Sequence, residues 1–362
     1  MKGFQPDYRH IVDAASNRAA KRVPLYEHII SDVVMERVLG RSFRDLHRSG
    51  NLADRKEYFR SYCGFFRDMG YDTVSFECWI GPTMPGSGAL GEHKPGVIHD
   101  RADFDRYPWH ELKDLYFQRY AEDFSLLREA MPEGMKAIGG VGNGLFECVQ
   151  DIVGYVNLSY ISADDPELYA DLFKAMGKVM RDIWAEFLLR FGDIYCVCRF
   201  GDDLGFRSAT LLAVEDIRRH IIPQYKHVVD LVHTAGKPFL LHSCGAIFDV
   251  MDDLIRVAGI DAKHSNEDAI APFSEWALRY GDRIGNFGGV DTDHLCRRSE
   301  TEIREIVFDV VRTMEGHGGF ALSSGNSIPD YVPVEGYLAM VRALREYRGD
   351  YRELPADRLV TR

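Results

Sequence analysis

The chain has 362 residues, of which 46% are hydrophobic and 28% charged, the composition of a soluble globular protein. Its formal net charge of −12 argues against nucleic acid or an anionic membrane surface as the main partner. No run of about 18 apolar residues could span a bilayer, and the seven cysteines are scattered without a Cys-x-x-Cys pair. We therefore expect a cytoplasmic protein in a reducing environment rather than a disulfide framework.

The first part of the chain begins with a polar stretch, residues 1–22, for which we predict a helical arm that carries no chemistry. Val23–Tyr26 is a short apolar run that could open a sheet. From Asp54 onward, aromatic residues recur at spacings of three and four, which predicts a helix that ends at Gly70. Residues 71–76 then have the composition of a strand.

A long loop rich in glycine and proline follows over residues 81–100, and a loop of this length is more often a functional lid than an idle connection. An apolar stripe predicts a helix from Glu111 to Met131. Next, residues 135–144 predict a strand that ends in glycines around Asn143. Neither phosphate-loop motif, G-x-G-x-x-G or G-x-x-x-x-G-K-[ST], is present, so close approach of a ligand to the backbone explains these glycines better.

The middle of the chain repeats the same alternation of helix and strand. A long helix is predicted over residues 165–191, and a strand over residues 194–200. Two carboxylates, Asp202 and Asp203, follow directly after the end of this strand. A further helix is predicted over residues 214–234.

Residues 237–267 are the most informative stretch: KPFLLHSCG, then AIFDVMDDLIRVA, then GIDAKHSNE, read as strand, amphipathic helix and strand. Side chains two apart on a strand point the same way, so His242 and Cys244 face one side at the strand's carboxyl end. Parallel α/β barrels keep their chemistry at that end. An imidazole and a thiolate that converge there can begin a zinc site. The alternative is a core histidine beside a buried free cysteine.

The last part adds two strands, over residues 284–291 and 320–326, and two helices, over residues 301–316 and 335–347. The tail, residues 348–362, is polar.

In total about eight strand ends occur, each followed by a helix, and no change of composition marks a second domain. We therefore predict one domain, residues 1–362, with the fold of a single (β/α)₈ TIM-type barrel and an N-terminal helical extension.

Polar side chains collect at the carboxyl ends of the predicted strands, and a barrel would fold these distant positions onto one rim. They are Glu77, Asn143, Asp202, Asp203, His242, Cys244, Glu267, Asp291 and Asn326. The plain explanation, that loops are polar, fits Asp203 and Asp291 well. It fits the His-x-Cys pair poorly, because both residues lie at the tip of an apolar strand. Glu267, after the next strand, would complete a zinc-compatible set of ligands: His242, Cys244 and Glu267.

Several segments resemble the uroporphyrinogen decarboxylase superfamily. They are DDLGF (202–206), GKPFLLHSCGAIFDVMDDLIRVAGIDA (236–262), GGVD (288–291) and SSGNSIPDYVPVEGYLAMVRALREY (323–347). That superfamily holds tetrapyrrole decarboxylases and methyltransferases that act with corrinoid proteins. The His-x-Cys pair is similar to the zinc motif of the methyltransferase branch.

The chain departs from both branches at specific places. The arginine-containing stretch with which true decarboxylases hold substrate carboxylates is absent from VPLYEHIISDVVMERV (23–38), and SFECW (75–79) lacks their aspartate. Thiol-methylating members carry a further cysteine late in the barrel, where this chain has Ser323 and Ser324. The resemblance therefore implies neither uroporphyrinogen nor a thiol such as coenzyme M as the substrate.

The first hypothesis from the resemblance is a zinc-dependent, O-demethylating methyltransferase. It would move a methyl group from a methoxylated or methylated-amine donor to the cobalamin of a partner corrinoid protein. Asp202, Glu77 or Asn143 would position the donor, and further contacts with it would come from Asp203, Asp291, Ser324 and Asn326. The alternatives are a decarboxylase of another acid, which needs cationic anchors, and a non-catalytic barrel that binds a tetrapyrrole or a corrinoid protein.

Overall fold

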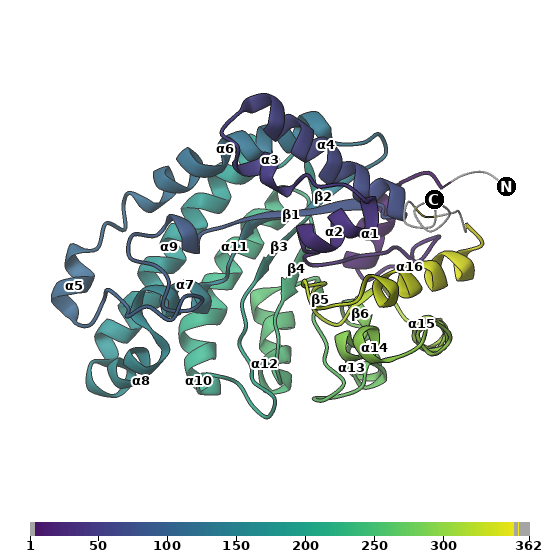
Figure 1. Ribbon diagram of the computed structural model, residues 1–362. Helices are drawn as coiled ribbons and strands as arrows, with labels where there is room; N and C mark the ends of the chain where they lie inside the picture. Colours follow the sequence, from purple (N-terminus) through teal and green to yellow (C-terminus); the bar gives the residue numbers. More distant parts are fainter. Residues whose placement is uncertain (1–3, 351–353, 355–362) are drawn as a thin grey trace.

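The computed structural model describes residues 4–350 and 354, and its centre is a sheet of seven parallel strands in the order β1-β2-β3-β4-β5-β6-β7 (Figure 1). The strands are β1 Thr73–Trp79, β2 Lys136–Gly142, β3 Tyr195–Gly201, β4 Phe239–His242, β5 Ala262–His264, β6 Gly285–Val290 and β7 Phe320–Ser324. Because neighbours in sequence are neighbours in the sheet, every connection is a crossover through helix, as in a TIM-type barrel. The predicted fold class is confirmed.

The eighth position of the barrel is occupied by residues 23–30, which form single bridges instead of a full ladder. Leu25 pairs with Leu322 of β7, and Ile30 pairs with Ile328 just beyond it. On the other side, the Ser75 hydroxyl of β1 donates a hydrogen bond to the carbonyl of His28 at 2.7 Å. This segment therefore lies between the first and last strands and links them.

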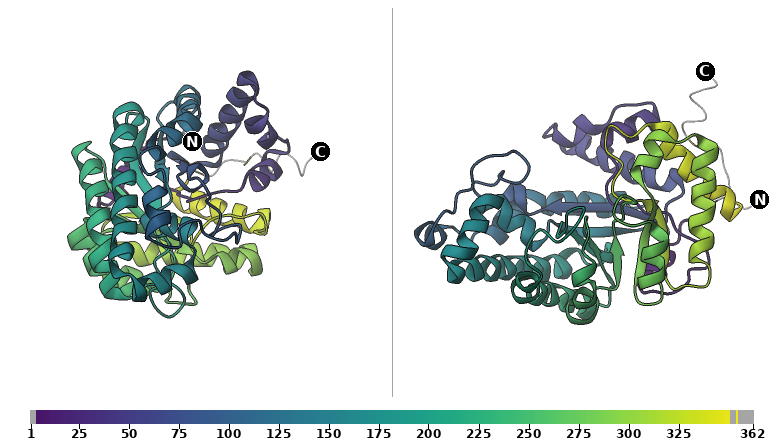
Figure 2. Two further views of the ribbon diagram at one scale, coloured as in Figure 1. Left: turned by 90° about the vertical axis from the view of Figure 1, so that its left-hand side faces the viewer. Right: turned by 90° about the horizontal axis from the view of Figure 1, so that it is seen from below.

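Helices cover the outside of the sheet, and Figure 2 shows α15 and α16 packed side by side there. The longer helices are α4 Leu52–Met69, α6 Leu112–Ala130, α7 Leu145–Val153, α8 Tyr155–Asp164, α9 Pro166–Phe191, α11 Ile222–Thr234, α15 Glu300–Met314 and α16 Val334–Arg348. The shorter ones are α1 Arg9–Ala15, α2 Asp32–Leu39, α3 Arg44–Arg48, α5 Arg101–Arg106, α10 Val214–Asp216, α12 Phe248–Asp253, α13 Phe273–Tyr280 and α14 Thr292–Arg297, with a 3₁₀ turn at Gly81–Thr83 and π turns at Ile217–Ile221 and Leu254–Ala258. Within the described residues, no helix is both long and apolar enough to cross a membrane.

The predicted helix over residues 214–234 is interrupted in the structure. It consists of α10, a π turn over Ile217–Ile221, and α11, which begins just before Pro223. Proline has no backbone N–H to donate to the preceding turn, so the regular hydrogen-bond pattern breaks there. By contrast, α4 ends as predicted at Gly70, whose left-handed φ of 91° favours glycine.

The N-terminal arm closes the amino-terminal end of the barrel. Helix α1 contacts β3, β6 and β7, and its residues Ile11, Ala14 and Ala15 are fully buried. The Ala14 carbonyl lies 1.9 Å from where a side-chain carbon would stand at Gly319, so this approach requires glycine. The helix thus fills the end of the barrel opposite the carboxyl ends of the strands. Of the predicted tail, residues 351–353 and 355–362 lie outside the described part of the chain.

Candidate metal centre and adjoining cavity

His242 and Cys244 converge at the carboxyl end of β4. His242 is the last residue of the strand, and its Nε2 lies 3.6 Å from the Cys244 Sγ. Parallel pairing places His264, the last residue of β5, beside His242. A single structural unit therefore brings together two imidazoles and one thiol.

The hydrogen bonds of His264 select the tautomer of His242. His264 Nε2 lies 3.0 Å from the Ser324 carbonyl, which can only accept, so this nitrogen carries the proton. In a neutral ring, Nδ1 is then the acceptor, and the His242 Nδ1 at 2.8 Å must donate to it. Burial lowers the pKa of His264 to about 3 and holds that of His242 well below its ordinary value, so both rings are neutral. The lone pair of His242 Nε2 therefore faces Cys244.

A carboxylate completes this set. Within the described residues, one possible ligand atom each from Asp203, His242 and Cys244 lies within 4.8 Å of the others. Asp203 is held there because its Oδ1 accepts a 2.9 Å hydrogen bond from the Cys244 backbone N–H. Nitrogen, sulfur and oxygen donors at this spacing fit zinc, and three protein ligands leave a fourth position open. Glu267 does not belong to this set, so its predicted role as a ligand stays a prediction.

The surroundings of the Cys244 sulfur favour an ionised form once a cation is nearby. Burial and the Asp203 carboxylate raise the pKa of the free thiol. Two donors nevertheless point at the sulfur: the Asn326 Nδ2 at 3.3 Å and the Ser265 hydroxyl at 3.5 Å. A bound metal cation would offset the desolvation, and these donors would then stabilise the thiolate.

A stacked pair of histidines extends the centre toward the N-terminal segment. The rings of His28 and His242 are nearly parallel, with centroids 3.8 Å apart, and His28, His242 and His264 also form a possible ligand group. Neither His28 nor His264 is among the site residues predicted from the sequence. The signal for His264 was available, because it ends the strand that neighbours the His-x-Cys strand.

Glu77, one of the predicted donor-positioning residues, forms a buried ion pair. Arg199 of β3 is completely buried and donates to the Glu77 Oε2 from Nε at 3.0 Å and from Nη2 at 2.8 Å. The remaining Arg199 nitrogen binds the Tyr26 and Ser75 hydroxyls. The Glu77 Oε1 accepts a 2.9 Å hydrogen bond from the half-exposed Trp79 indole. The Glu77 side chain is thus nearly buried, and its charge is already balanced.

The other two predicted donor-positioning residues hold the start of α7. The Asp202 carboxylate is fully buried and accepts hydrogen bonds from the Phe146 and Glu147 backbone N–H groups at 2.9 and 2.8 Å, and from the Tyr225 hydroxyl. Asn143 donates to the Glu147 carboxylate at 3.0 Å. These contacts anchor the helix start behind Asp203, and the predicted roles in donor binding stay predictions.

The remaining predicted residues lie around the same rim with internal partners. Asp291 caps α14 through the Asp293 N–H at 2.7 Å and accepts a second hydrogen bond, also 2.7 Å, from the Asp268 N–H. The Ser324 hydroxyl donates to the buried Glu27 carboxylate at 2.6 Å. Burial, followed by the carboxylates of Asp291 and Asp203, raises the pKa of Glu267. Of these residues, only Asn326 contacts the Cys244 sulfur directly.

The long loop over residues 81–100 is tied to α7. The Asp151 carboxylate accepts hydrogen bonds from the backbone N–H groups of Gly88 at 3.0 Å and Leu90 at 2.9 Å. Further along, Val97 and Ile98 both donate to the Ile152 carbonyl. The loop is therefore fixed at two points, and its closure over a substrate stays a prediction.

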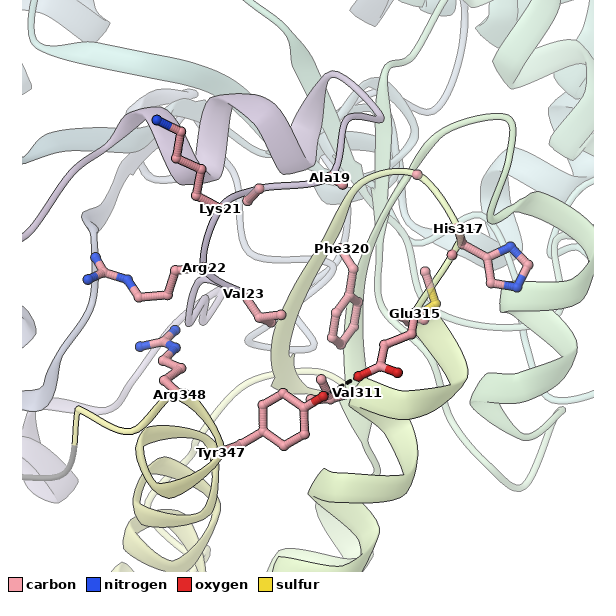
Figure 3. A pocket seen from close by; sticks show the side chains of 14 residues that line it. Ala19, Lys21, Arg22, Val23, Val311, Glu315, His317, Phe320, Tyr347 and Arg348 are labelled. Carbon is pink, nitrogen blue, oxygen red and sulfur yellow. Dashed lines mark hydrogen bonds between the residues drawn. The ribbon is translucent and has the colours of Figure 1, made fainter.

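Two cavities differ in their relation to this centre. One, of about 370 Å³, extends from His28, Glu77 and Arg199 toward α2, α3 and α4. The other, of about 470 Å³, lies at the opposite end of the sheet beside the start of β7, where Figure 3 shows Arg22 and Arg348 on one side and Glu315 with Tyr347 on the other. None of the predicted site residues, all within the described part of the chain, lines this second cavity. Only the first cavity adjoins the candidate centre.

Comparisons with known proteins agree with this architecture. The family model described as "Uroporphyrinogen decarboxylase (URO-D)" matches residues 84–347. A methyltransferase from Methanosarcina mazei has a similar fold, with a TM-score of 0.67 and 15% identity over 93% of this chain and 98% of that chain. A protein from Listeria monocytogenes described as a vitamin-B12-independent methionine synthase gives a TM-score of 0.50 and 12% identity over 90% and 99%. At these identities the likeness extends to the fold alone. A search of curated proteins finds no match.

Proposed function

Because the chain belongs to the uroporphyrinogen decarboxylase family, whose members are enzymes, we propose that it is a zinc-dependent methyltransferase of the branch that acts with corrinoid proteins. It would move a methyl group from an oxygen- or nitrogen-linked donor to the cobalamin of a separate corrinoid protein. His242, Cys244 and Asp203 would hold the zinc ion. Asp203 replaces the predicted ligand Glu267 in this set, because one of its oxygens lies within 4.8 Å of the other two donor atoms.

The observation that carries this proposal is the fixed tautomer of His242. A histidine that served only to fill the core would need no partner that directs a lone pair at a thiol. Here the Ser324 carbonyl, His264 and His242 form a chain of two hydrogen bonds, and the chain leaves Nε2 unprotonated beside Cys244 and Asp203. Metal-ligating histidines are held by their second ring nitrogen in this way.

Each part of the chain has a defined task in this proposal. When bound, zinc supplies Lewis acidity that makes the donor's heteroatom a better leaving group. Asn326 and Ser265 stabilise the Cys244 thiolate, and His264 keeps the His242 ring in place. Helix α1 closes the far end of the barrel, so donor and corrinoid protein must both approach the carboxyl ends of the strands.

The cavity argues against the decarboxylase alternative. A substrate with several carboxylates needs unpaired cations, since a buried charge without a partner is costly. Among the described residues, Arg199 is the one arginine that lines the cavity, and no lysine lines it. Arg199 is already bound by Glu77. The segment where true decarboxylases carry their arginines contributes His28, Ile29, Ile30, Ser31 and Asp32 to the cavity wall.

The test is spectroscopic. Zinc-loaded enzyme, cob(I)alamin and a panel of methoxyaromatics and methylamines should give methylcob(III)alamin, and His242→Ala should abolish its formation. Exposed Glu335→Gln, in the first turn of α16, is the matched control and should behave as wild type. Coproporphyrinogen formation from uroporphyrinogen, or methyl transfer that survives His242→Ala, would contradict the proposal.

A further inference from the structure

The cavity beside the candidate centre has a chemical character of its own. It opens between the N-terminal helices α2 to α4 and the end of β1, and its volume of about 370 Å³ is within the range of small-molecule sites. Its inner end is formed by His28, whose ring is stacked on His242. Only the His28 ring would therefore separate a molecule bound in the cavity from His242, the proposed metal ligand.

Five tyrosine, phenylalanine and tryptophan rings line this cavity beside the imidazoles of His28 and His47, and three carboxylates accompany them. The aromatic residues are Tyr58, Tyr62, Phe76, Trp79 and Tyr120, and the acidic ones are Asp32, Glu77 and Asp123. Aromatic faces attract cations through the quadrupole of the ring.

Two of the three carboxylates are already neutralised by the protein. Arg199 binds Glu77 through two nitrogens, as described above. Asp123 accepts a 2.7 Å hydrogen bond from Arg55 and lies 3.2 Å from the His47 Nε2. The charges of Glu77 and Asp123 are therefore neutralised by side chains in the wall of the cavity.

Asp32 is different, because it forms no ion pair with a lysine or arginine in the described part of the chain. Its carboxylate receives only long hydrogen bonds, of 3.3 and 3.4 Å, from the Tyr58 hydroxyl. The nearby Arg44 pairs with Glu36 instead, at 3.6 Å. Burial raises the pKa of Asp32, and the Tyr58 hydroxyl and the nearby His47 and Arg44 only partly offset this effect.

We propose that this cavity binds a methyl donor that carries a positively charged ammonium group, with that group beside Asp32 and the aromatic rings. The inference deepens the proposed function, since it takes the cavity next to the metal centre as the donor site. It selects cationic donors over neutral and anionic ones. The donor's methyl-bearing heteroatom would point inward, toward His28 and His242.

His28 supports this orientation. Its Nδ1 is buried and has no hydrogen-bond partner in the described structure, although the ring lines the cavity. A buried polar atom without a partner is costly, so the inner end of the cavity is the part of its wall where hydrogen bonding is incomplete. The outer end, at Asp32, offers a negative charge.

Three probes of one shape and different charge test the proposal by calorimetry on the zinc-loaded full chain. They are 2-phenylethylammonium, 2-phenylethanol and phenylacetate. We expect the ammonium to bind on the order of ten-fold more tightly than the alcohol, and phenylacetate most weakly. Asp32→Asn should remove most of this preference, whereas Asp114→Asn, the same change at an exposed position on α6, should not.

A second variant guards against a folding defect. Tyr120→Leu keeps an apolar wall but removes a ring, so it should weaken the ammonium more than the alcohol. Equal affinity for ammonium and alcohol in the wild type, or an unchanged preference in a folded Asp32→Asn protein, would overturn the inference. Methyl transfer from neutral methoxyaromatics without a cation preference would overturn the inference of a cationic donor but leave the proposed function standing. A cation preference without any methyl transfer would support a cation site in this cavity and refute the proposed function.

Discussion

His242 can act as a metal ligand toward Cys244 in only one of its two neutral tautomers, and His264 selects that tautomer. We predict that His264→Leu weakens zinc binding by about 10- to 100-fold, the usual effect of losing a residue that orients a metal ligand. His264→Asn should retain most of the affinity, because its side-chain oxygen can accept the His242 Nδ1 proton. Competition with a chromophoric chelator measures both constants. Equal zinc affinity in wild type and His264→Leu would show that His264 is only a packing residue.

At this scale the sequence predicted the pair but not the full set. His242 and Cys244 were visible because they are two residues apart on one strand. Asp203 and Glu267 both follow strands, and no periodicity tells which carboxylate turns toward the sulfur. The choice depends on the hydrogen bond between the Cys244 N–H and Asp203, a contact between two loops.

At the scale of elements, the strand-like segment over residues 23–30 joins β7 to the rest of the barrel through a buried carboxyl group. Glu27 is completely buried, and its carboxylate accepts hydrogen bonds from the Ser324 N–H at 2.8 Å and from the Ser324 hydroxyl. Burial raises its pKa from 4.5 to about 8. The folded state therefore holds a proton between these pH values that the unfolded state has lost.

This difference in proton binding sets the sign of a pH effect on stability. The contribution of Glu27 to the free energy of unfolding is fully present below about pH 4.5. It is lost as the pH rises toward 8, by at most ~1.4 kcal/mol per pH unit. Glu27→Gln should remove this dependence, so the variant should be more stable than wild type at pH 8 and similar to it near pH 5. Urea unfolding across this range measures the effect, with exposed Glu335→Gln as the control. A parallel loss of stability in wild type and Glu27→Gln would refute the role of Glu27.

The elements themselves were largely predictable, and the exceptions have physical causes. Helix α4 and its end at Gly70 follow from aromatic spacing and a glycine cap. The interruption before α11 follows from Pro223, a local signal that the apolar pattern concealed. The segment over residues 23–30 pairs with β7, almost 300 residues away, and nothing local reveals such a partner.

At the scale of the whole molecule, the barrel brings distant residues to one rim, and the regular alternation of strand and helix made this predictable. The cavity was not predictable, because its wall combines α2, α3, α4, α6 and β1. The wall of this cavity is the basis both for the argument against a decarboxylase and for the proposed cationic donor. Where a decarboxylase would need free arginines, this chain presents aromatic rings and Asp32, which has no lysine or arginine partner in the described part of the chain.

The proposed chemistry requires a zinc ion held by His242, Cys244 and Asp203. X-ray absorption at the zinc edge of the loaded protein tests this ligand set most directly. We predict stoichiometric zinc with one sulfur ligand at ~2.3 Å and nitrogen or oxygen ligands at ~2.0–2.2 Å. Cys244→Ser should lose the sulfur shell while the fold persists, and buried Cys148→Ser, on α7 outside the ligand set, should keep it. A spectrum without sulfur, or one that is unchanged in Cys244→Ser, would contradict this ligand set.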